Sequence, residues 1–272
     1  MIRKILYPLL VLLLLLMLYF GIKSYTFAIE YEAQTTELVS HQGAEEQASR
    51  QLSKLAKSIL GDFYNDKNKV MVDTIRAQQD YAMHEAKQYM YYFMATLAVL
   101  LLAYFFISLR SFTIFGALGA MITLTFGLIT PILMVTIHKE VEYLGDIVLS
   151  FESKGVVGSI IKLWDGGDII VALVILLFSV IVPIVKILSL LFVSIFVESK
   201  FAHSIVKFFK MIGKWSMVDV FVVAVFLVYL TANKGDVSRA EVEVGLYFFL
   251  AYVIVSMLVS LSADRMLHKL KA

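Results

Sequence analysis

The sequence predicts an all-α polytopic membrane protein with six transmembrane helices, an extracytoplasmic helical hairpin and a small outer β-hairpin loop. Of the 272 residues, 60% are hydrophobic and 17% are charged, whereas a soluble domain carries about 25% charged residues. The mean hydropathy is +0.82. The apolar residues are also clustered into runs of roughly twenty, the length of helix that crosses the apolar core of a bilayer. These observations exclude an ordinary soluble enzyme, a disordered protein and a nucleic-acid-binding protein.

Six segments are long and apolar enough to span a membrane. The first could be a signal peptide, because Arg3 and Lys4 precede its leucine-rich core. That core is long, however, and the residues after Gly21 form a poor cleavage site, so we interpret this segment as an uncleaved anchor. The six predicted spans are Ile5–Ile22, Tyr89–Leu109, Phe112–Ile137, Ile169–Val197, Val218–Leu230 and Val244–Ser262.

The distribution of lysine and arginine predicts the orientation of these spans. With the N-terminus inside, the inner segments hold ten of these residues and the short outer loops hold five. Short loops that are rich in lysine and arginine stay on the cytoplasmic side. We therefore expect both termini to face the cytoplasm.

Residues 23–88 form the main polar region and are predicted to fold as a helical hairpin. Apolar residues within Ala48–Ile59 recur at spacings of three and four, the stripe of a packed helix. A turn over 61–68, rich in Gly, Asp and Asn, separates this helix from a second one that begins near Lys69. The hairpin would then stand on the first two membrane helices.

The outer loop 138–168 has a different pattern. Val135–His138 and Ile147–Phe151 are rich in β-branched residues and are separated by turn-forming residues, which predicts a short β-hairpin. A helix near Val156–Leu163 follows, with Trp164 placed at the membrane interface.

The inner loop 198–216 carries a basic face. Two interpretations stay open: an amphipathic helix that binds anionic lipid headgroups, or a loop that only follows the positive-inside rule. The candidate headgroup residues recur, with His203, at spacings of three and four, and they are Lys200, Lys207, Lys210 and Lys214.

Polar residues inside the predicted spans are candidate functional residues, because a bilayer penalises them. Ser179, Pro183 and Lys186 lie in the fourth span, and Asp219 lies one turn inside the fifth, after Trp215 and Ser216. Lys186 and Asp219 are expected at compatible depths, so an ion pair would relieve both desolvation costs. Such a pair could bind a headgroup or change protonation, or it could be only a structural clasp between helices.

Thr130 and Pro131 lie near the outer end of the third predicted span, where proline would free a backbone carbonyl and could line a cavity. Earlier in the same span, Gly119, Thr123 and Gly127 repeat at intervals of four. A stripe of small residues at this spacing predicts close helix packing.

The sequence shows no motif for catalysis. It contains no phosphate-binding loop, nucleophile elbow, zinc-protease motif or paired-acid motif. It has no cysteine, and its five histidines do not cluster in sequence. We therefore expect a protein that is not an enzyme and has no cofactor and no metal site.

From the third span onward the chain resembles the paraquat-inducible protein A family. Three blocks carry the resemblance, and the third is the most specific. They are Thr130–Thr136, then Ile161–Gly167 followed by Leu177–Lys186, and last Gly213–Phe221. Better-known members have two such modules and a cysteine-rich zinc segment, whereas this chain has one module and no cysteine. The expected division is an N-terminal part, 1–109, and a four-helix module, 110–272.

The resemblance implies a component of a lipid-trafficking system in a bacterial inner membrane. Its implied partners are membrane lipids and a periplasmic protein with a mammalian-cell-entry (MCE) domain, and no nucleic acid. Two alternatives remain: a non-transporting adaptor that anchors a periplasmic partner through residues 23–88, or a stress or signal receptor. The resemblance places Pro183, Lys186, Trp215, Ser216 and Asp219 in the polar core.

Overall fold

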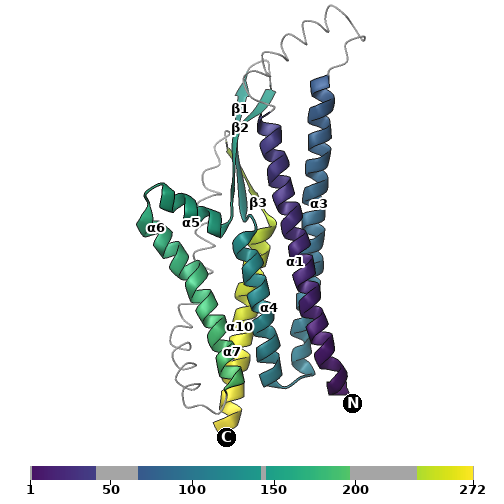
Figure 1. Cartoon of the computed structure of the whole chain (residues 1–272), viewed down its shortest axis with the longest axis vertical. Coiled ribbons are helices and arrows are strands. Elements are labelled where there is room, and N and C mark those ends of the chain that lie inside the picture. The colour runs from purple at the N-terminus through teal and green to yellow at the C-terminus, as the bar shows by residue number, and fades with distance from the viewer. Residues whose placement is uncertain (1, 41–66, 142–144, 197–237, 272) are drawn as a thin grey trace, which may run out of the picture.

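The structure is a computed structural model, and it describes residues 2–40, 67–141, 145–196 and 238–271 (Figure 1). Five of the described helical stretches are long and apolar enough to cross a membrane. The chain is therefore a multi-pass membrane protein, as the sequence predicts. The predicted span Val218–Leu230 lies outside the described residues. The five stretches are Leu6–Leu38, Asp73–Phe105, Leu109–Ile129, Ile169–Ile195 and Val244–Met266.

The first two helices form a long antiparallel pair. α1 (Ile2–Ser40) has 39 residues and α3 (Lys67–Leu102) has 36, so each is more than 50 Å long at about 1.5 Å per residue. This exceeds the ~30 Å bilayer core, and the ends of both helices therefore extend beyond it. We call the extending part, residues 23–40 and 67–88, the stalk. The start of α3 agrees with the second helix of the predicted hairpin, near Lys69, whereas the predicted first helix, Ala48–Ile59, and most of the predicted turn lie outside the described residues.

Polar contacts inside the pair fix the register of α1 against α3. The Ser24 hydroxyl donates a 2.8 Å hydrogen bond to the backbone carbonyl of Ala86. Higher in the stalk, the amide of Gln79 donates a 2.7 Å bond to the Thr35 hydroxyl. The two helices therefore pack against each other along the stalk as well as in the membrane.

The next span is shorter than predicted. A 3-10 turn, η2 (Ala103–Phe105), ends the second span, and α4 (Leu109–Ile129) begins after Ser108, whose hydroxyl caps it. The prediction that this span extends to Ile137 is wrong. The helix stops because Pro131 disfavours helical backbone at the preceding residue, and Thr130 is extended, with φ −79° and ψ 144°.

The remaining apolar residues of that run enter a three-stranded antiparallel sheet. β1 (Leu133–Val141) lies between β2 (Gly145–Lys154) and β3 (Ser238–Val242). Thr136 of β1 is the register partner of Phe151 in β2 on one side and of Arg239 in β3 on the other. The predicted β-hairpin is therefore confirmed, and a third strand that was not predicted joins it from about a hundred residues further along the chain.

The fourth span follows the sheet and is interrupted. α5 (Val156–Asp165) confirms the predicted helix, and a turn with Gly167 at φ +88° leads into α6 (Ile169–Ile175). A π-helical segment, η3 (Leu176–Ile181), then joins α6 to α7 (Val182–Ile195). The guanidinium of Arg110 in α4 donates hydrogen bonds to the carbonyls of Ser194 and Ile195, at 2.9 and 3.0 Å. These bonds give partners to backbone carbonyls that the end of α7 leaves without intrahelical donors, and they attach the end of α7 to the start of α4.

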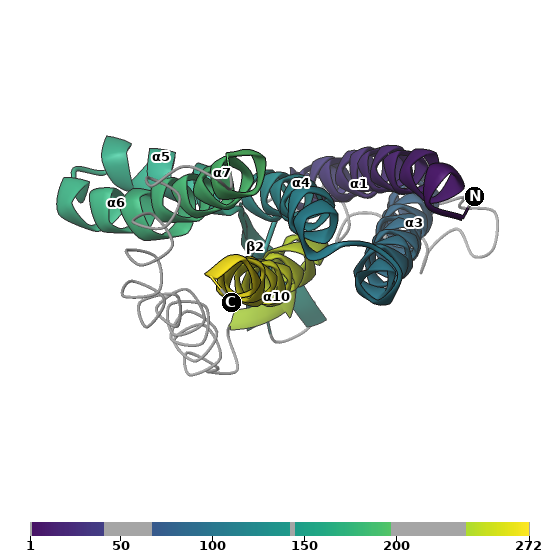
Figure 2. The ribbon, with the colours of Figure 1, turned by 90° about the horizontal axis from the view of Figure 1, so that it is seen from below.

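The last helix, α10 (Val244–Lys271), begins at the residue where the sixth span is predicted to begin. Seen from below, α7, α4 and α1 lie in one layer, and α10 and α3 lie in a second (Figure 2). Phe93 of α3 belongs to one continuous hydrophobic core. The centroid of its ring lies 6.1 Å from that of Phe126 in α4 and 4.8 Å from that of Phe248 in α10. The two N-terminal helices therefore share a core with the rest of the protein.

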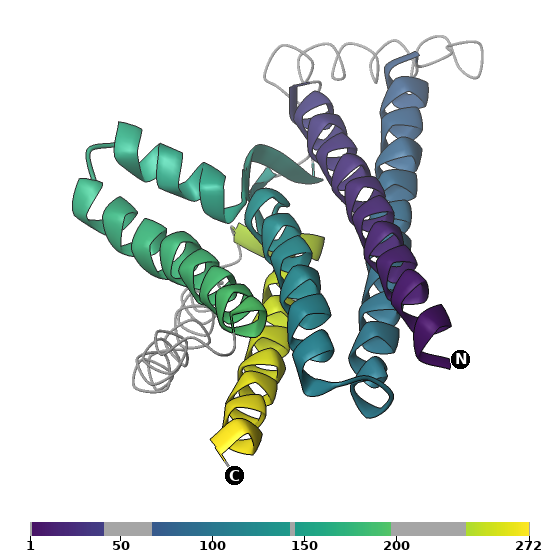
Figure 3. The same ribbon diagram turned by 60° about the horizontal axis from the view of Figure 1, so that its bottom comes forward.

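Both described ends of the chain lie at the same end of the bundle, and the sheet lies at the other (Figure 3). α7 ends near the termini, whereas β3 begins at the sheet (Figure 1). This arrangement of the described residues is the one that an even number of spans requires.

Candidate functional site

Lys186 lies on the buried face of α7. Only 8% of its side chain is exposed, and its Nζ donates a 3.3 Å hydrogen bond to the Ser256 hydroxyl of α10. Ser256 in turn donates a 3.0 Å bond to the carbonyl of Val253. The predicted intramembrane lysine is thus directed into the bundle and linked to the last helix.

Backbone geometry next to Lys186 departs from a regular α-helix. Pro183 has no N–H group, so the carbonyl of Ser179 cannot accept the usual bond from residue 183. The π-helical turn adapts to this, and the N–H of Val182 bonds instead to the carbonyl of Leu177. Ser179 and Pro183 are both buried. The structure therefore places Ser179, Pro183 and Lys186 together, on one helix and at an irregularity of a kind that is frequent at functional sites.

Thr130 and Pro131 belong to a different part of the molecule, which we call the outer junction (Thr130–Ile132 with Glu243–Gly245). The carbonyl of Pro131 accepts a hydrogen bond from the N–H of Gly245, and that of Ile132 accepts one from the N–H of Glu243, both at 2.9 Å. A Cβ at Gly245 would overlap the carbonyl oxygens of Thr130 and Pro131. The end of α4 and the start of α10 are therefore joined backbone to backbone.

The outer junction and Lys186 are separate sites. Gly245 contacts Pro131, and Ser256 contacts Lys186. These two residues of α10 are eleven positions apart, or roughly 16 Å along a helix axis. The structure thus does not bring Thr130 and Pro131 to the predicted polar core.

The outer junction also holds two buried polar side chains without hydrogen-bond partners among the described residues. They are the hydroxyl of Thr130 and both carboxylate oxygens of Glu243. Burial raises the pKa of Glu243 to about 7, helped by the negative charges of Glu241 and Glu32 and opposed by Lys87. Sequence reasoning missed Glu243. The alternation of charged residues at 239, 241 and 243 with small or apolar ones was a signal for a strand, but not for the burial of Glu243.

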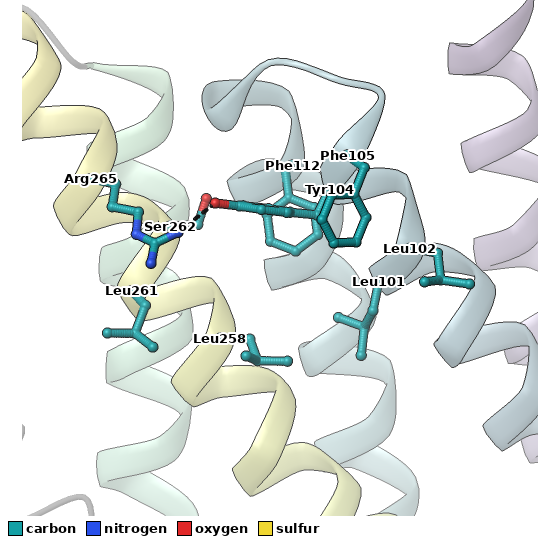
Figure 4. A pocket seen from close by; sticks show the side chains of 9 residues that line it. All are labelled: Leu101, Leu102, Tyr104, Phe105, Phe112, Leu258, Leu261, Ser262 and Arg265. Atoms are coloured by element: carbon teal, nitrogen blue, oxygen red, sulfur yellow. Dashed lines mark hydrogen bonds between the residues drawn. The ribbon is translucent and has the colours of Figure 1, made fainter.

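A cavity of about 370 Å³ opens at the end of the bundle nearest the termini (Figure 4). Leucines of α3 and α10, among them Leu101 and Leu258, and the rings of Tyr104, Phe105 and Phe112 make its walls apolar. Arg265 and Ser262 are its polar members. The guanidinium of Arg265 is directed across the cavity, where it donates a 2.7 Å hydrogen bond to the Tyr104 hydroxyl.

Close contacts join three of the elements that line the cavity, with α4 in contact with both α10 and η2. The Thr113 hydroxyl donates a 3.3 Å bond to that of Ser262, in one possible direction of this hydroxyl pair, and the ring of Phe112 lies 5.0 Å from that of Tyr104 in a T-shaped arrangement. Sequence reasoning did not predict the cavity. Its parts come from three segments, and only the positive charge of Arg265 at the end of the last span was a local signal.

Several predicted site residues lie outside the described part of the chain. They are Trp215, Ser216 and Asp219 of the predicted polar core and the headgroup candidates Lys200, Lys207, Lys210 and Lys214. The predicted pair of Lys186 with Asp219 therefore stays a prediction.

Comparison with known proteins places the chain in a family. The sequence model of the family described as paraquat-inducible protein A matches residues 113–268. A Haemophilus influenzae protein called a probable intermembrane transport protein is 32% identical over 108 residues, which are 38% of this chain and 26% of that protein. The Escherichia coli K12 intermembrane transport protein PqiA is 29% identical over 115 residues, 40% of this chain and 27% of that protein.

The matched segments thus cover about a quarter of the length of these curated relatives. No solved structure matches the chain. The family match covers more than half of the 272 residues, from the fifth residue of α4 to near the end of α10. The chain therefore belongs to the paraquat-inducible protein A family.

Proposed function

We propose that the protein is an inner-membrane component of a lipid-trafficking system. It handles a phospholipid or a related amphiphile together with an MCE-domain protein of the periplasm, and it has no enzymatic activity of its own. Both termini face the cytoplasm, so the cavity lies toward the cytoplasmic leaflet and the stalk and sheet lie outside. The names of the Haemophilus and Escherichia relatives, which refer to intermembrane transport, support a transport role.

The observation that carries this proposal is the combination of apolar walls and one guanidinium in the cavity. Its volume of about 370 Å³ is within the range of small-molecule sites. Leucine and aromatic walls suit an acyl chain. Arg265 has five N–H donors and uses one nitrogen for Tyr104, so further donors remain for a phosphate, which guanidinium binds strongly.

The polar core is the second element of the proposal. Ser179, Pro183 and Lys186, with Trp215, Ser216 and Asp219, form a site that binds a headgroup or changes protonation as lipid moves. Support comes from the burial of Lys186, the π-helical turn before it and its bond to Ser256. The basic face of Lys200, Lys207, Lys210 and Lys214 then gathers anionic lipid at the inner surface.

Filling the cavity tests the proposal. A phospholipid with a photoactivatable acyl chain is added to the purified full-length protein in nanodiscs, and the crosslinked peptides are identified by mass spectrometry. We expect crosslinks in 101–112 and 258–265, and a several-fold lower yield in Leu258→Trp. Leu250→Trp is the matched control, because Leu250 lies on the exposed side of the same helix and does not line the cavity. Equal yields in the two variants, or crosslinks spread evenly over all spans, would contradict a lipid site here.

The stalk favours a second candidate function, a non-transporting adaptor. Paired helices that extend past the bilayer present a surface to a periplasmic partner. An adaptor predicts that a partner copurifies with Lys186→Met and with Leu258→Trp but not with a protein whose stalk has been shortened. A transporter predicts in addition that both point variants lose lipid-dependent envelope integrity.

A further inference from the structure

Glu243 is a buried carboxyl group that the proposed lipid site does not use. It lies between β3 and α10, one residue before the candidate span Val244–Met266. Its side chain is 1% exposed, and within the described residues neither oxygen has a hydrogen-bond partner. An ionised carboxylate is unfavourable in such a place because it loses its hydration and gains no donor in return.

The neighbouring charges do not compensate for this loss. Among the described residues, Glu241 of β3 and Glu32 of α1 repel a negative charge on Glu243, and Lys87 of α3 attracts it. The N-terminus of α10 also favours an anion, but the Glu243 carboxylate makes no bond to the N–H groups there. The protonated form is therefore favoured, and the carboxyl group has a pKa of about 7.

The backbone holds Glu243 in this position. Its N–H bonds to Ile132, and that of Gly245 bonds to Pro131. Gly245 has no space for even a Cβ, so the chain cannot shift there while α4 and α10 stay joined. The side chain therefore reaches water only if the outer junction opens.

We propose that Glu243 is a proton-binding site, and that release of the proton opens the outer junction between the sheet and α10. A proton suits this site because it removes the charge of a buried carboxylate that has no hydrogen-bond donor among the described residues. A metal ion needs several ligands, and no group of three or more His, Asp or Glu side chains suited to one occurs in the part of the chain that the structure describes. Glu243 joins the sheet to α10, the helix that carries both Ser256 and the cavity residue Leu258. Release of the proton at Glu243 therefore acts on the helix that contributes to both proposed lipid sites.

Infrared difference spectroscopy of the full-length protein in nanodiscs tests the proton directly. Spectra recorded between pH 5 and pH 9 should contain a protonated carboxyl band that disappears with a midpoint near pH 7 and is absent from Glu243→Gln. Glu241→Gln should keep the band but lose it at a lower pH than the wild type, because the repulsion from the Glu241 carboxylate is gone while burial still disfavours the charge on Glu243. A retained band with a lower midpoint therefore assigns the titration to Glu243. Loss of the band in Glu241→Gln would assign it to Glu241 and overturn the proposal. A wild-type spectrum without a protonated carboxyl at pH 6 would overturn the proposal, whether or not either variant folds.

Hydrogen–deuterium exchange tests the opening. Exchange of residues 238–246 is compared between the wild type and Glu243→Gln at each pH, so that the intrinsic pH dependence of exchange cancels. We expect equal rates at pH 5.5 and at least tenfold faster exchange in the wild type at pH 8.5. Equal rates at both pH values would show that the junction does not respond to the proton.

Discussion

The Nζ of Lys186 and the hydroxyl of Ser256 lie 3.3 Å apart across the interface between α7 and α10. Serine is neutral, so this bond satisfies one donor of the ammonium group and leaves its charge to be balanced by other groups. The groups that balance the charge of Lys186 therefore decide whether this lysine has a structural or a functional role.

We predict that neutralising Lys186 alone destabilises the protein. If Lys186 pairs with Asp219, Lys186→Met leaves a buried carboxylate and costs roughly 3–5 kcal/mol, and the double variant with Asp219→Asn recovers much of that loss. Thermal unfolding in detergent measures both effects, with the exposed Lys269→Met as control. A double variant that is stable but fails to support envelope integrity indicates a lipid or proton site. Normal integrity would leave only the structural clasp.

Gly127 of α4 is predicted to be intolerant of any side chain. A Cβ there would lie 2.8 Å from the backbone nitrogen of Phe249, so Gly127→Ala must separate α4 from α10. Overpacking of this kind costs about 1–3 kcal/mol. Gly158 in α5 is the matched control, because a Cβ there meets nothing within 4 Å. Gly158→Ala should be neutral or slightly stabilising, and similar melting temperatures for both variants would contradict the close packing.

Stability should fall as pH rises through the titration of Glu243. The folded state holds this proton up to about pH 7, whereas the unfolded chain releases it near 4.5. The folded state therefore binds more protons between these values, and stability decreases with pH across that window. The loss approaches about 3 kcal/mol above pH 7. Glu243→Gln should remove this dependence, and the exposed Asp168→Asn should not. A wild-type melting temperature that is constant from pH 5 to pH 8 would argue against a protonated Glu243.

The absence of native cysteine makes the topology directly testable. Single cysteines at Ser58 and Ser153 should react with a membrane-impermeant maleimide from the periplasmic side, and one at Ser199 should not. Ser153 is in β2, so it also reports the side on which the sheet lies. Labelling of the cysteine at position 199 from the periplasmic side would contradict the predicted topology.

Hydropathy could predict the positions of the helices but not the end of α4. The start of the last span at Val244 coincides with a sharp change from charged to apolar residues. In contrast, Phe112–Ile137 contains no charged residue and is mostly apolar, and such a run does not distinguish a buried helix from a buried strand. Pro131 was the local signal for the boundary, because it restricts the residue before it.

The sites that the sequence could not predict depend on long-range pairing. β3 pairs with β1 although about a hundred residues separate them in the sequence. The cavity is lined by residues from the ends of α3, α4 and α10. Lys186 could be identified as a candidate because its charge is unusual in an apolar segment. Glu243 lies just outside such a segment, and only the packing of three other elements makes its burial apparent. The division at residue 109 stays a prediction, although α1 and α3 contribute to the same core as α4 and α10.

The strand order β2-β1-β3 has a consequence for biosynthesis. The hairpin of β1 and β2 can form as soon as residue 154 has been made, but one edge of β1 stays unpaired until residue 242 has been made. Open strand edges recruit other chains, so the nascent protein passes through a stage in which it is exposed to intermolecular pairing. A chain that ends before β3 would keep that edge open, and it should therefore aggregate more readily than a chain that contains β3.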